Sequence, residues 1–172
     1  MIKLIAFDVD GTLTDGSLIL GPEGEAYKKF NAKDGLGLSL AHRMGYIVGF
    51  ITGRKSPFAE QRARELSLDF ILDGIDDKVS ALDRLLKQNG ISWEETAYMG
   101  DDLNDLPVLL RVGLPAVPKD ACGDCLGAAR FISPCCGGEG AARSLIERII
   151  KGEGRWKEAL SHYLDQQEKN FQ

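Results

Sequence analysis

Residues 2–16 read IKLIAFDVDGTLTDG, an apolar run that leads directly into two aspartates and a glycine turn. A strand buried on both faces has this continuous apolar character, and ligands of parallel sheets bind at the carboxyl ends of such strands. Alternation along the strand would point Asp8 and Asp10 to the same side. Two carboxylates held together repel each other unless a cation lies between them. The pair therefore predicts a cation site at the end of a central strand.

Apolar runs and helical patterns alternate along the rest of the chain. Runs typical of strands recur at 2–8, 46–51, 70–72, 96–99, 112–116 and 131–132, and helical patterns at 35–44, 57–66, 77–88, 103–111, 120–129 and 141–151. The turn signal GPEG at 21–24 predicts a hairpin over 17–30. This alternation is typical of an α/β fold, a doubly wound parallel sheet of the Rossmann-like type. We expect one domain over 1–152 and a helical tail over 153–172, with its helix at 155–168.

The composition limits the possible partners. Of the 172 residues, 44% are hydrophobic and 27% charged, and the formal net charge is −5. An acidic chain lacks the basic face that phosphate backbones require, so we expect no nucleic-acid partner. No apolar run is long enough to cross a bilayer, and we do not interpret the N-terminus as a signal peptide, because its removal would discard the aspartate pair. We therefore expect a cytoplasmic protein with no membrane partner.

The four cysteines allow two interpretations. Cys122 and Cys125 form a CxxC pair, and Cys135 and Cys136 are adjacent to each other. In a cytosolic chain such a set can bind zinc. The alternative is that the four are small apolar side chains near a surface loop. Adjacent cysteines rarely give two ligands to one metal, which favours the second interpretation.

Three further polar clusters fall at or just beyond predicted strand ends. TGRKS at 52–56 can bind an anion through its hydroxyl, the free N–H groups of a helix start and Arg54, or it can simply supply a serine cap for the 57–66 helix. Lys78 opens a helix, where a lysine is usually solvated. GDDLND at 100–105 places three aspartates after a strand, where a helix dipole can also favour a negative charge. Each cluster taken alone has a structural explanation.

Taken together, the clusters suit phosphoryl transfer. Asp8, Asp10 and Asp101 form an oxygen-rich set that suits Mg²⁺ rather than zinc or copper. Thr52 and Lys78 add a hydroxyl donor and a positive charge, which a transferring phosphoryl group needs. No Ser-His-Asp or Cys-His arrangement competes with this set. A carboxylate nucleophile would give an aspartyl-phosphate intermediate.

These residues resemble the haloacid dehalogenase superfamily of phosphotransferases. Its four motifs match in order, as DVDGT at 8–12, Thr52-Gly53, Lys78, and GDDxxD at 100–105. The resemblance implies the fold of that superfamily, with Asp8 as the nucleophile and Asp10 as the general acid and base. It further implies that Mg²⁺ is held by the Asp8 carboxylate, the Asp10 backbone carbonyl and Asp101. Asp102 or Asp105 would lie behind these ligands and orient them.

The spacing of the motifs leaves no room for a separate cap domain. Between Asp15 and Thr52 there is space for a hairpin, one helix and one strand, and between Gly53 and Lys78 for one helix and one short strand. An open site excludes water poorly, which is a defect for phosphoryl transfer. Either a macromolecular substrate or a neighbouring subunit must therefore cover the site.

A finer resemblance favours a neighbouring subunit. The segments DG at 15–16, KFNxxDG at 29–35, ITGRKS at 51–56, GDDLxDLP at 100–107 and GGxGA at 137–141 are similar to those of 3-deoxy-D-manno-octulosonate 8-phosphate (KDO 8-phosphate) phosphatases. That family is capless and homotetrameric, with hairpins that associate, which implies the same for 17–30 here. It implies phosphate binding by Asp10, Thr52, Gly53 and Lys78, and a sugar-acid pocket lined by Asn31, Ala32, Lys33, Asp34, Gly35, Arg54 and Arg62. Two arginines suit a substrate that carries a carboxylate as well as a phosphate.

One departure keeps a second substrate open. Glu139 stands where the octulosonate phosphatases usually have arginine, and related phosphatases of nine-carbon sugar acids resemble this chain there. Those enzymes tend to have glutamate at the position of Arg54, and Arg54 lies beside the motif threonine, so we give it more weight. The alternative is hydrolysis of KDN or N-acetylneuraminate 9-phosphate. A non-catalytic domain is disfavoured because all four motifs are intact. The eight-carbon substrate would place the enzyme in lipopolysaccharide synthesis.

Overall fold

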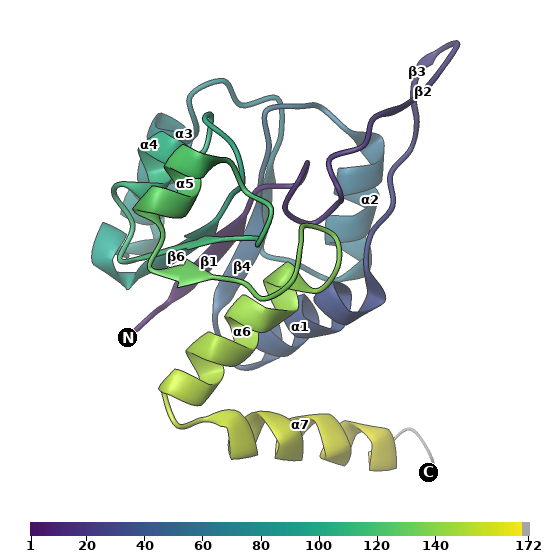
Figure 1. Ribbon diagram of the computed structural model, residues 1–172. Coiled ribbons are helices and arrows are strands. Elements are labelled where there is room, and N and C mark those ends of the chain that lie inside the picture. Colours follow the sequence, from purple (N-terminus) through teal and green to yellow (C-terminus); the bar gives the residue numbers. More distant parts are fainter. Residues whose placement is uncertain (170–172) are drawn as a thin grey trace.

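The first apolar run forms β1 (Leu4–Phe7), and all four of its residues are buried inside a parallel sheet. The computed structural model describes residues 1–169, and side chains as far as residue 165. It shows one sheet between two layers of helices (Figure 1). The six strands lie in the order β5 (Phe70–Leu72), β4 (Ile47–Ile51), β1, β6 (Thr96–Met99), β7 (Leu114–Val117) and β8 (Phe131–Ile132).

Alternate residues of β1 contact opposite helical layers, as period-two geometry requires. Ile5 and Phe7 pack into the core below α1 (Ala32–Arg43), α2 (Pro57–Glu65) and α6 (Ala141–Gly152). Leu4 and Ala6 pack into the core below α3 (Lys78–Asn89), α4 (Leu106–Leu109) and α5 (Gly123–Ala128). The predicted doubly wound α/β fold is confirmed.

The register of the central strands brings three loops to one edge of the sheet. Phe7 of β1 is paired with Phe50 of β4 on one side and with Met99 of β6 on the other. The N–H of Asp8 donates to the carbonyl of Met99 at 2.9 Å, which extends the pairing by one residue. The segments that follow β1, β4 and β6 therefore begin side by side.

The predicted hairpin is present and projects from the body of the protein (Figure 1). It consists of β2 (Ile19–Gly21) and β3 (Gly24–Tyr27), which are shorter than the segments expected at 17–20 and 25–30. Gly24 has φ +116°, a conformation that suits glycine in the tight turn. Large apolar side chains on the hairpin are exposed to solvent, namely Leu18, Ile19, Leu20 and Tyr27.

Two helices differ in length from the expectation. α1 begins at Ala32 rather than at residue 35, because the Asn31 side chain caps it by accepting the N–H of Lys33 at 2.8 Å. α4 covers only Leu106–Leu109 of the expected 103–111, because the aspartates of the preceding loop form turns. A short 3₁₀ turn, Trp93–Glu95, leads into β6.

The tail forms α7 (Trp156–Lys169), close to the expected 155–168. Trp156 and the buried Ala159 pack against the core of α1 and α6. Residues 170–172 of the predicted tail lie outside the described residues. The separation of a domain over 1–152 from this tail stays a prediction. Over the part of the chain that is described, the helices are too short or too polar to span a bilayer.

A buried carboxylate joins α1 to α6. Asp34, only 2% exposed, accepts the backbone N–H groups of Gly140 at 3.2 Å and Arg143 at 2.8 Å. Burial raises the pKa of Asp34, although the N–H donors act in the opposite direction. α6 begins at a glycine without a side-chain cap of its own, so Asp34 supplies the missing acceptor.

Replacing Asp34 by alanine should lower the free energy of unfolding by about 2 kcal/mol, because the two N–H groups lose their acceptor. Urea unfolding at neutral pH measures the change. Lys33→Ala, on the adjacent exposed residue, should change stability by less than about 0.5 kcal/mol. An equally small effect of Asp34→Ala would contradict this role.

Candidate active site

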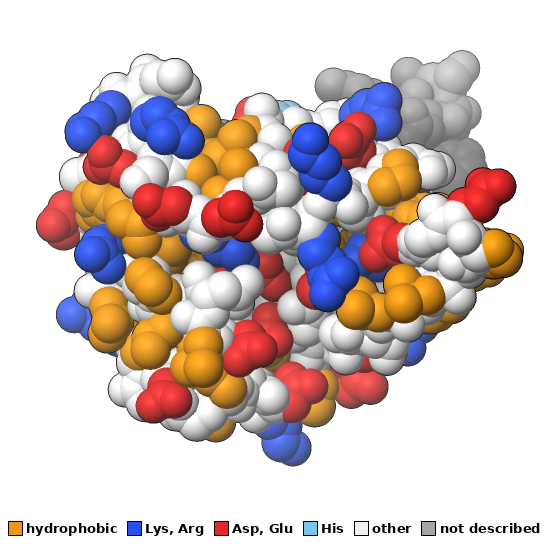
Figure 2. Space-filling view, turned by 90° about the horizontal axis from the view of Figure 1, so that it is seen from above, with side chains coloured by type: hydrophobic (Ala, Val, Ile, Leu, Met, Phe, Trp, Pro, Cys, Tyr) orange, Lys and Arg blue, Asp and Glu red, His pale blue; other side chains and the backbone are white. Residues whose placement is uncertain are grey.

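The loops at the carboxyl edge of the sheet enclose a cleft of about 430 Å³. Asp10 enters it from the loop after β1, Arg54 from the loop after β4, and Asp101 from the loop after β6. Figure 2 looks down on the molecule from this side and shows acidic and basic side chains gathered around a hollow. The remaining lining residues are Gly16, Leu18, Gly53, Asp102, Leu103 and Asn104.

A buried lysine lies at the base of the site. Lys78 Nζ donates to Asp8 Oδ1 at 2.5 Å and to Asp105 Oδ1 at 2.6 Å, and its side chain is 2% exposed. Burial alone lowers the pKa of Lys78, but the two carboxylates outweigh burial and raise it. These contacts favour the positively charged form of Lys78 beside Asp8. The alternative of a solvated lysine is wrong.

Asp105 organises the loop that bears Asp101. Its Oδ1 also accepts the hydroxyl of Tyr98 at 2.6 Å, and its Oδ2 accepts the N–H groups of Asp101 at 3.0 Å and Asp102 at 3.3 Å. A side chain at Gly100 would collide with this carboxylate. Both oxygens of Asp105 are thus committed to the protein.

Asp8, Asp101 and Asp105 bring carboxylate oxygens within 4.8 Å of one another. Thr12 holds Asp101 by donating to its Oδ1 at 3.0 Å, and Gly11, with φ +91°, leaves the space that the Asp101 carboxylate fills. Since Asp105 is committed elsewhere, Asp8 and Asp101 are the carboxylates that can hold a metal. An all-oxygen set of this kind fits Mg²⁺.

Burial and mutual repulsion raise the pKa values of two carboxyl groups in the acidic cluster. Burial and the neighbouring Asp105 raise the pKa of Asp8 despite the opposing effect of Lys78. Burial, followed by the charge of Asp105, raises the pKa of Asp101 to about 7. One ammonium does not compensate for three carboxylates at such short range, so a divalent cation would relieve the remaining repulsion.

Asp10 contacts a residue that the sequence did not suggest. Its Oδ1 accepts from Lys28 Nζ, and Lys28 also pairs with Glu25 at 2.8 Å. Glu25 Oε2 in turn accepts the hydroxyl of Ser56 at 2.5 Å. No spacing pattern connects residue 28 with residue 10, because the path of the hairpin brings them together. Tyr98 and Thr12 were likewise missed.

The segment after β4 forms the serine cap, and its binding of an anion stays a prediction. Ser56 caps α2 by accepting the N–H of Ala59 at 3.3 Å, as the structural explanation required. Thr52 is buried, and its Oγ1 accepts the N–H of Arg54 at 3.4 Å. Arg54 itself lines the cleft, in reach of an anion there.

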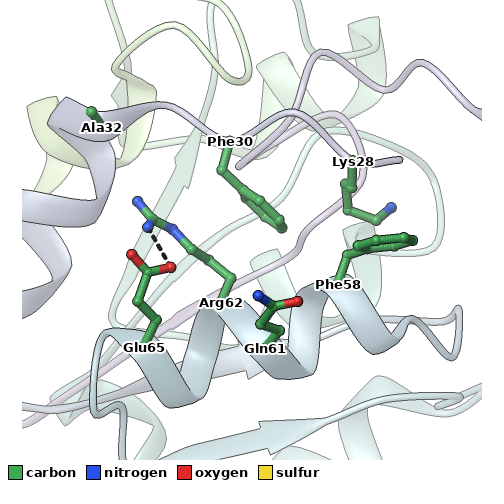
Figure 3. Close-up of a pocket in the computed structure, with 7 residues that line it drawn as sticks. All are labelled: Lys28, Phe30, Ala32, Phe58, Gln61, Arg62 and Glu65. Atoms are coloured by element: carbon green, nitrogen blue, oxygen red, sulfur yellow. Dashed lines mark ion pairs between the residues drawn. The ribbon is translucent and has the colours of Figure 1, made fainter. Parts of the chain in front are cut away.

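Arg62 lies in a second pocket, of about 310 Å³, beside the cleft (Figure 3). Its guanidinium pairs with Glu65 at 2.9 Å, lies 5.9 Å from the centre of the Phe30 ring, and occupies the space that a side chain at Gly35 would need. Ala32 also lines this pocket, so part of the predicted sugar-acid set is gathered here. The structure thus separates Arg62 from Arg54 within one chain.

The other residues predicted for the sugar-acid pocket lie at the start of α1, and two of them make contacts within the protein. Asn31 Nδ2 donates to the carbonyl of Gly138 at 3.3 Å, Lys33 is exposed, and Asp34 holds α6 as described above. The role of these residues in binding substrate stays a prediction.

The cysteines do not form a metal centre over the described residues, where the acidic cluster is the only grouping of three or more ligand side chains. Cys125 is buried and donates its thiol to the carbonyl of Asp102 at 3.1 Å. Cys135 is half-buried against the core of α1 and α6. The apolar interpretation is the better one.

The chain is similar to known hydrolases. Residues 69–145 match the family described as haloacid dehalogenase-like hydrolase. The 3-deoxy-D-manno-octulosonate 8-phosphate phosphatase KdsC of Escherichia coli K12 is 37% identical over 158 residues, which are 92% of this chain and 84% of KdsC.

Two solved structures share the whole architecture. The octulosonate 8-phosphate phosphatase of Moraxella catarrhalis, in complex with magnesium, phosphate and KDO, is 38% identical with a TM-score of 0.90, covering 94% of this chain and 93% of that one. The cobalt-bound Haemophilus influenzae phosphatase is 36% identical with a TM-score of 0.86, covering 89% and 90%. The chain described here therefore belongs to the haloacid dehalogenase-like hydrolases and, within them, to the family of 3-deoxy-D-manno-octulosonate 8-phosphate phosphatases.

Proposed function

We propose that this protein hydrolyses KDO 8-phosphate to KDO and inorganic phosphate in a Mg²⁺-dependent reaction. The observation that carries the proposal is the buried cluster of Asp8, Lys78 and Asp105 beside Asp101, at the end of the central strands. The relative from Moraxella catarrhalis, which contains magnesium, phosphate and KDO, supports the choice of substrate.

Asp8 would act as the nucleophile. Lys78 occupies its Oδ1, so the other oxygen would attack phosphorus and form an aspartyl-phosphate. The ammonium of Lys78 lies where it would also neutralise the phosphoryl oxygens. The Asp8 carboxylate, the Asp10 carbonyl and Asp101 would hold Mg²⁺. When bound, the ion supplies positive charge to the transferring phosphoryl group.

Asp10 would move the protons of both steps. In the first, its carboxyl group would protonate the sugar oxygen as the bond to phosphorus breaks. In the second, its carboxylate would take a proton from the water that attacks the aspartyl-phosphate, which releases phosphate and restores Asp8.

The carboxylate of the sugar acid would be recognised by Arg54, which lines the cleft. The nine-carbon alternative rests on Glu139, which is exposed and lines neither the cleft nor the pocket of Arg62. This difference in location favours the eight-carbon substrate.

We also propose that the protein acts in the cytoplasm as a homotetramer. The exposed apolar side chains of the hairpin, Leu20 and Tyr27 among them, are 70% accessible and would become buried when hairpins associate.

Asp8→Asn should lower kcat by at least ~1,000-fold, because an amide is a poor nucleophile for phosphorus. Phosphate release from a phosphorylated sugar acid measures the loss. The matched control is Asp124→Asn on the exposed start of α5, which should keep full activity. Comparable turnover by Asp8→Asn would contradict the nucleophile assignment.

Mg²⁺ binding should weaken as the pH falls. The raised pKa values of Asp8 and Asp101 mean that these carboxyl groups hold protons in the metal-free protein, and Mg²⁺ must displace them. The apparent Kd should rise by up to about tenfold for each proton displaced per pH unit below about pH 7. Calorimetric titrations at several pH values measure the trend. A Kd that does not change with pH would rule out proton displacement.

A panel of phosphorylated sugar acids tests the substrate. We expect KDO 8-phosphate to have the highest kcat/KM, since differential binding in the transition state sets specificity. Arg54→Glu should lower kcat/KM for it by about 100-fold, through loss of the carboxylate contact. A preference of the unmodified protein for nine-carbon 9-phosphates would favour the alternative instead.

A further inference from the structure

A second buried lysine, Lys28, contacts the proposed acid and base. Its side chain is 1% exposed, and its Nζ contacts both Asp10 Oδ1 and Glu25 Oε1. Figure 3 shows this side chain at the end of the Arg62 pocket, above Phe58 of α2. Lysines are rarely buried without such partners. Residues from the β1 loop, the hairpin and the start of α2 therefore meet in one chain of contacts.

Stability does not explain this arrangement well. Lys28 lies just beyond β3, at the base of a hairpin that otherwise projects into solvent. Burying an ammonium costs several kcal/mol, and its attraction to carboxylates often does no more than offset that cost. A solvent-exposed lysine at this position would avoid the cost altogether. The contact with Asp10 points instead to a role in the reaction.

We infer that Lys28 is a positioning residue that holds Asp10 Oδ1 and so leaves Oδ2 as the oxygen that gives the proton to the leaving group. Glu25 and Ser56 keep Lys28 in place, since Glu25 bridges the ammonium and the Ser56 hydroxyl. The inference rests on the proposed function, in which Asp10 is the general acid.

Asp10 gives its proton in the first step of the reaction. An Asp8 oxygen forms a bond to phosphorus while the bond from phosphorus to the sugar oxygen breaks. The electron pair of that bond goes to the sugar oxygen, which takes the proton from Asp10 Oδ2. Without Lys28 the carboxyl group of Asp10 can rotate, and the proton is less often directed at the leaving oxygen.

Two other roles for Lys28 make different predictions. A lysine that only attracts anionic substrates would change KM for all phosphate esters alike. A lysine that only stabilises the fold would lower the activity toward all esters by a common factor. A positioning role lowers kcat/KM, which reports the step that forms the aspartyl-phosphate, for the esters that need a proton to leave, and spares kcat/KM for those that do not.

The experiment compares two esters, a phosphorylated sugar acid and p-nitrophenyl phosphate, whose leaving group needs no proton. Lys28→Met should lower kcat/KM about 100-fold for the sugar-acid ester. We expect a loss of less than about threefold for p-nitrophenyl phosphate, because general acid catalysis contributes little there. The matched control is Lys29→Met, which alters an exposed lysine paired with Asp15 and should leave both values unchanged.

Asp10→Asn serves as the reference. It should show the same selective loss, larger than that of Lys28→Met. Adding Lys28→Met to Asp10→Asn should have no further effect, because the lysine acts only through the acid. Glu25→Gln, which retains Lys28 but removes the second carboxylate that holds it, should show a weaker loss in the same direction. This variant tests the inference even if Lys28→Met folds poorly.

Equal losses for both esters in Lys28→Met and Glu25→Gln would overturn the inference. So would full additivity with Asp10→Asn. If Asp10→Asn itself lowers kcat/KM equally for both esters, the acid assignment in the proposed function fails. That result is distinct from a selective Asp10→Asn paired with an unselective Lys28→Met, which would leave the proposed function standing.

Discussion

The site depends on one ammonium placed between two carboxylates. Lys78 begins α3, Asp8 directly follows β1, and Asp105 precedes α4, so the Lys78 side chain joins three segments at the carboxyl edge of the sheet. Without that charge, Asp8 and Asp105 would repel each other in a buried environment, and breaking a buried pair of this kind costs about 3–5 kcal/mol. The loop carrying Asp101 depends on the same contact, because Asp105 holds the backbone N–H of Asp101.

The sequence predicted the parts of the fold and site that follow from strand ends. Asp8 and Asp101 could be placed together because β1 and β6 are parallel neighbours, and apolar runs marked both strands. Lys28 could not be placed beside Asp10, since its position depends on the path of the hairpin before the chain reaches α1. The same holds for Arg62, whose pocket is set by the packing of α2 against residues 28–32, which lead into α1. The helix predicted at 103–111 is longer than the observed α4. The Asp105 side chain accepts the N–H groups of Asp101 and Asp102, and these contacts hold the segment before α4 in turns.

Lys78 and Lys28 make the same pattern of contacts with carboxylates in the site. Each takes one oxygen of an aspartate in the β1 loop: Lys78 that of Asp8, and Lys28 that of Asp10. Each is fixed by a second carboxylate, Asp105 or Glu25, which is itself hydrogen-bonded to a hydroxyl. The repeated pattern orients both aspartates with cations that come from different parts of the chain.

The groups proposed for bond breaking and those proposed for substrate recognition come from different parts of the sequence. The groups proposed for bond breaking follow β1 and β6 or begin α3, at the carboxyl edge of the sheet, whereas the arginines that would recognise the sugar acid come from the β4 loop and α2. Substitutions in the second set alter no contact of Lys78 with its carboxylates. Evolution can therefore change what such a protein accepts while the reaction itself is retained, which makes this architecture well suited to diversification among phosphorylated metabolites.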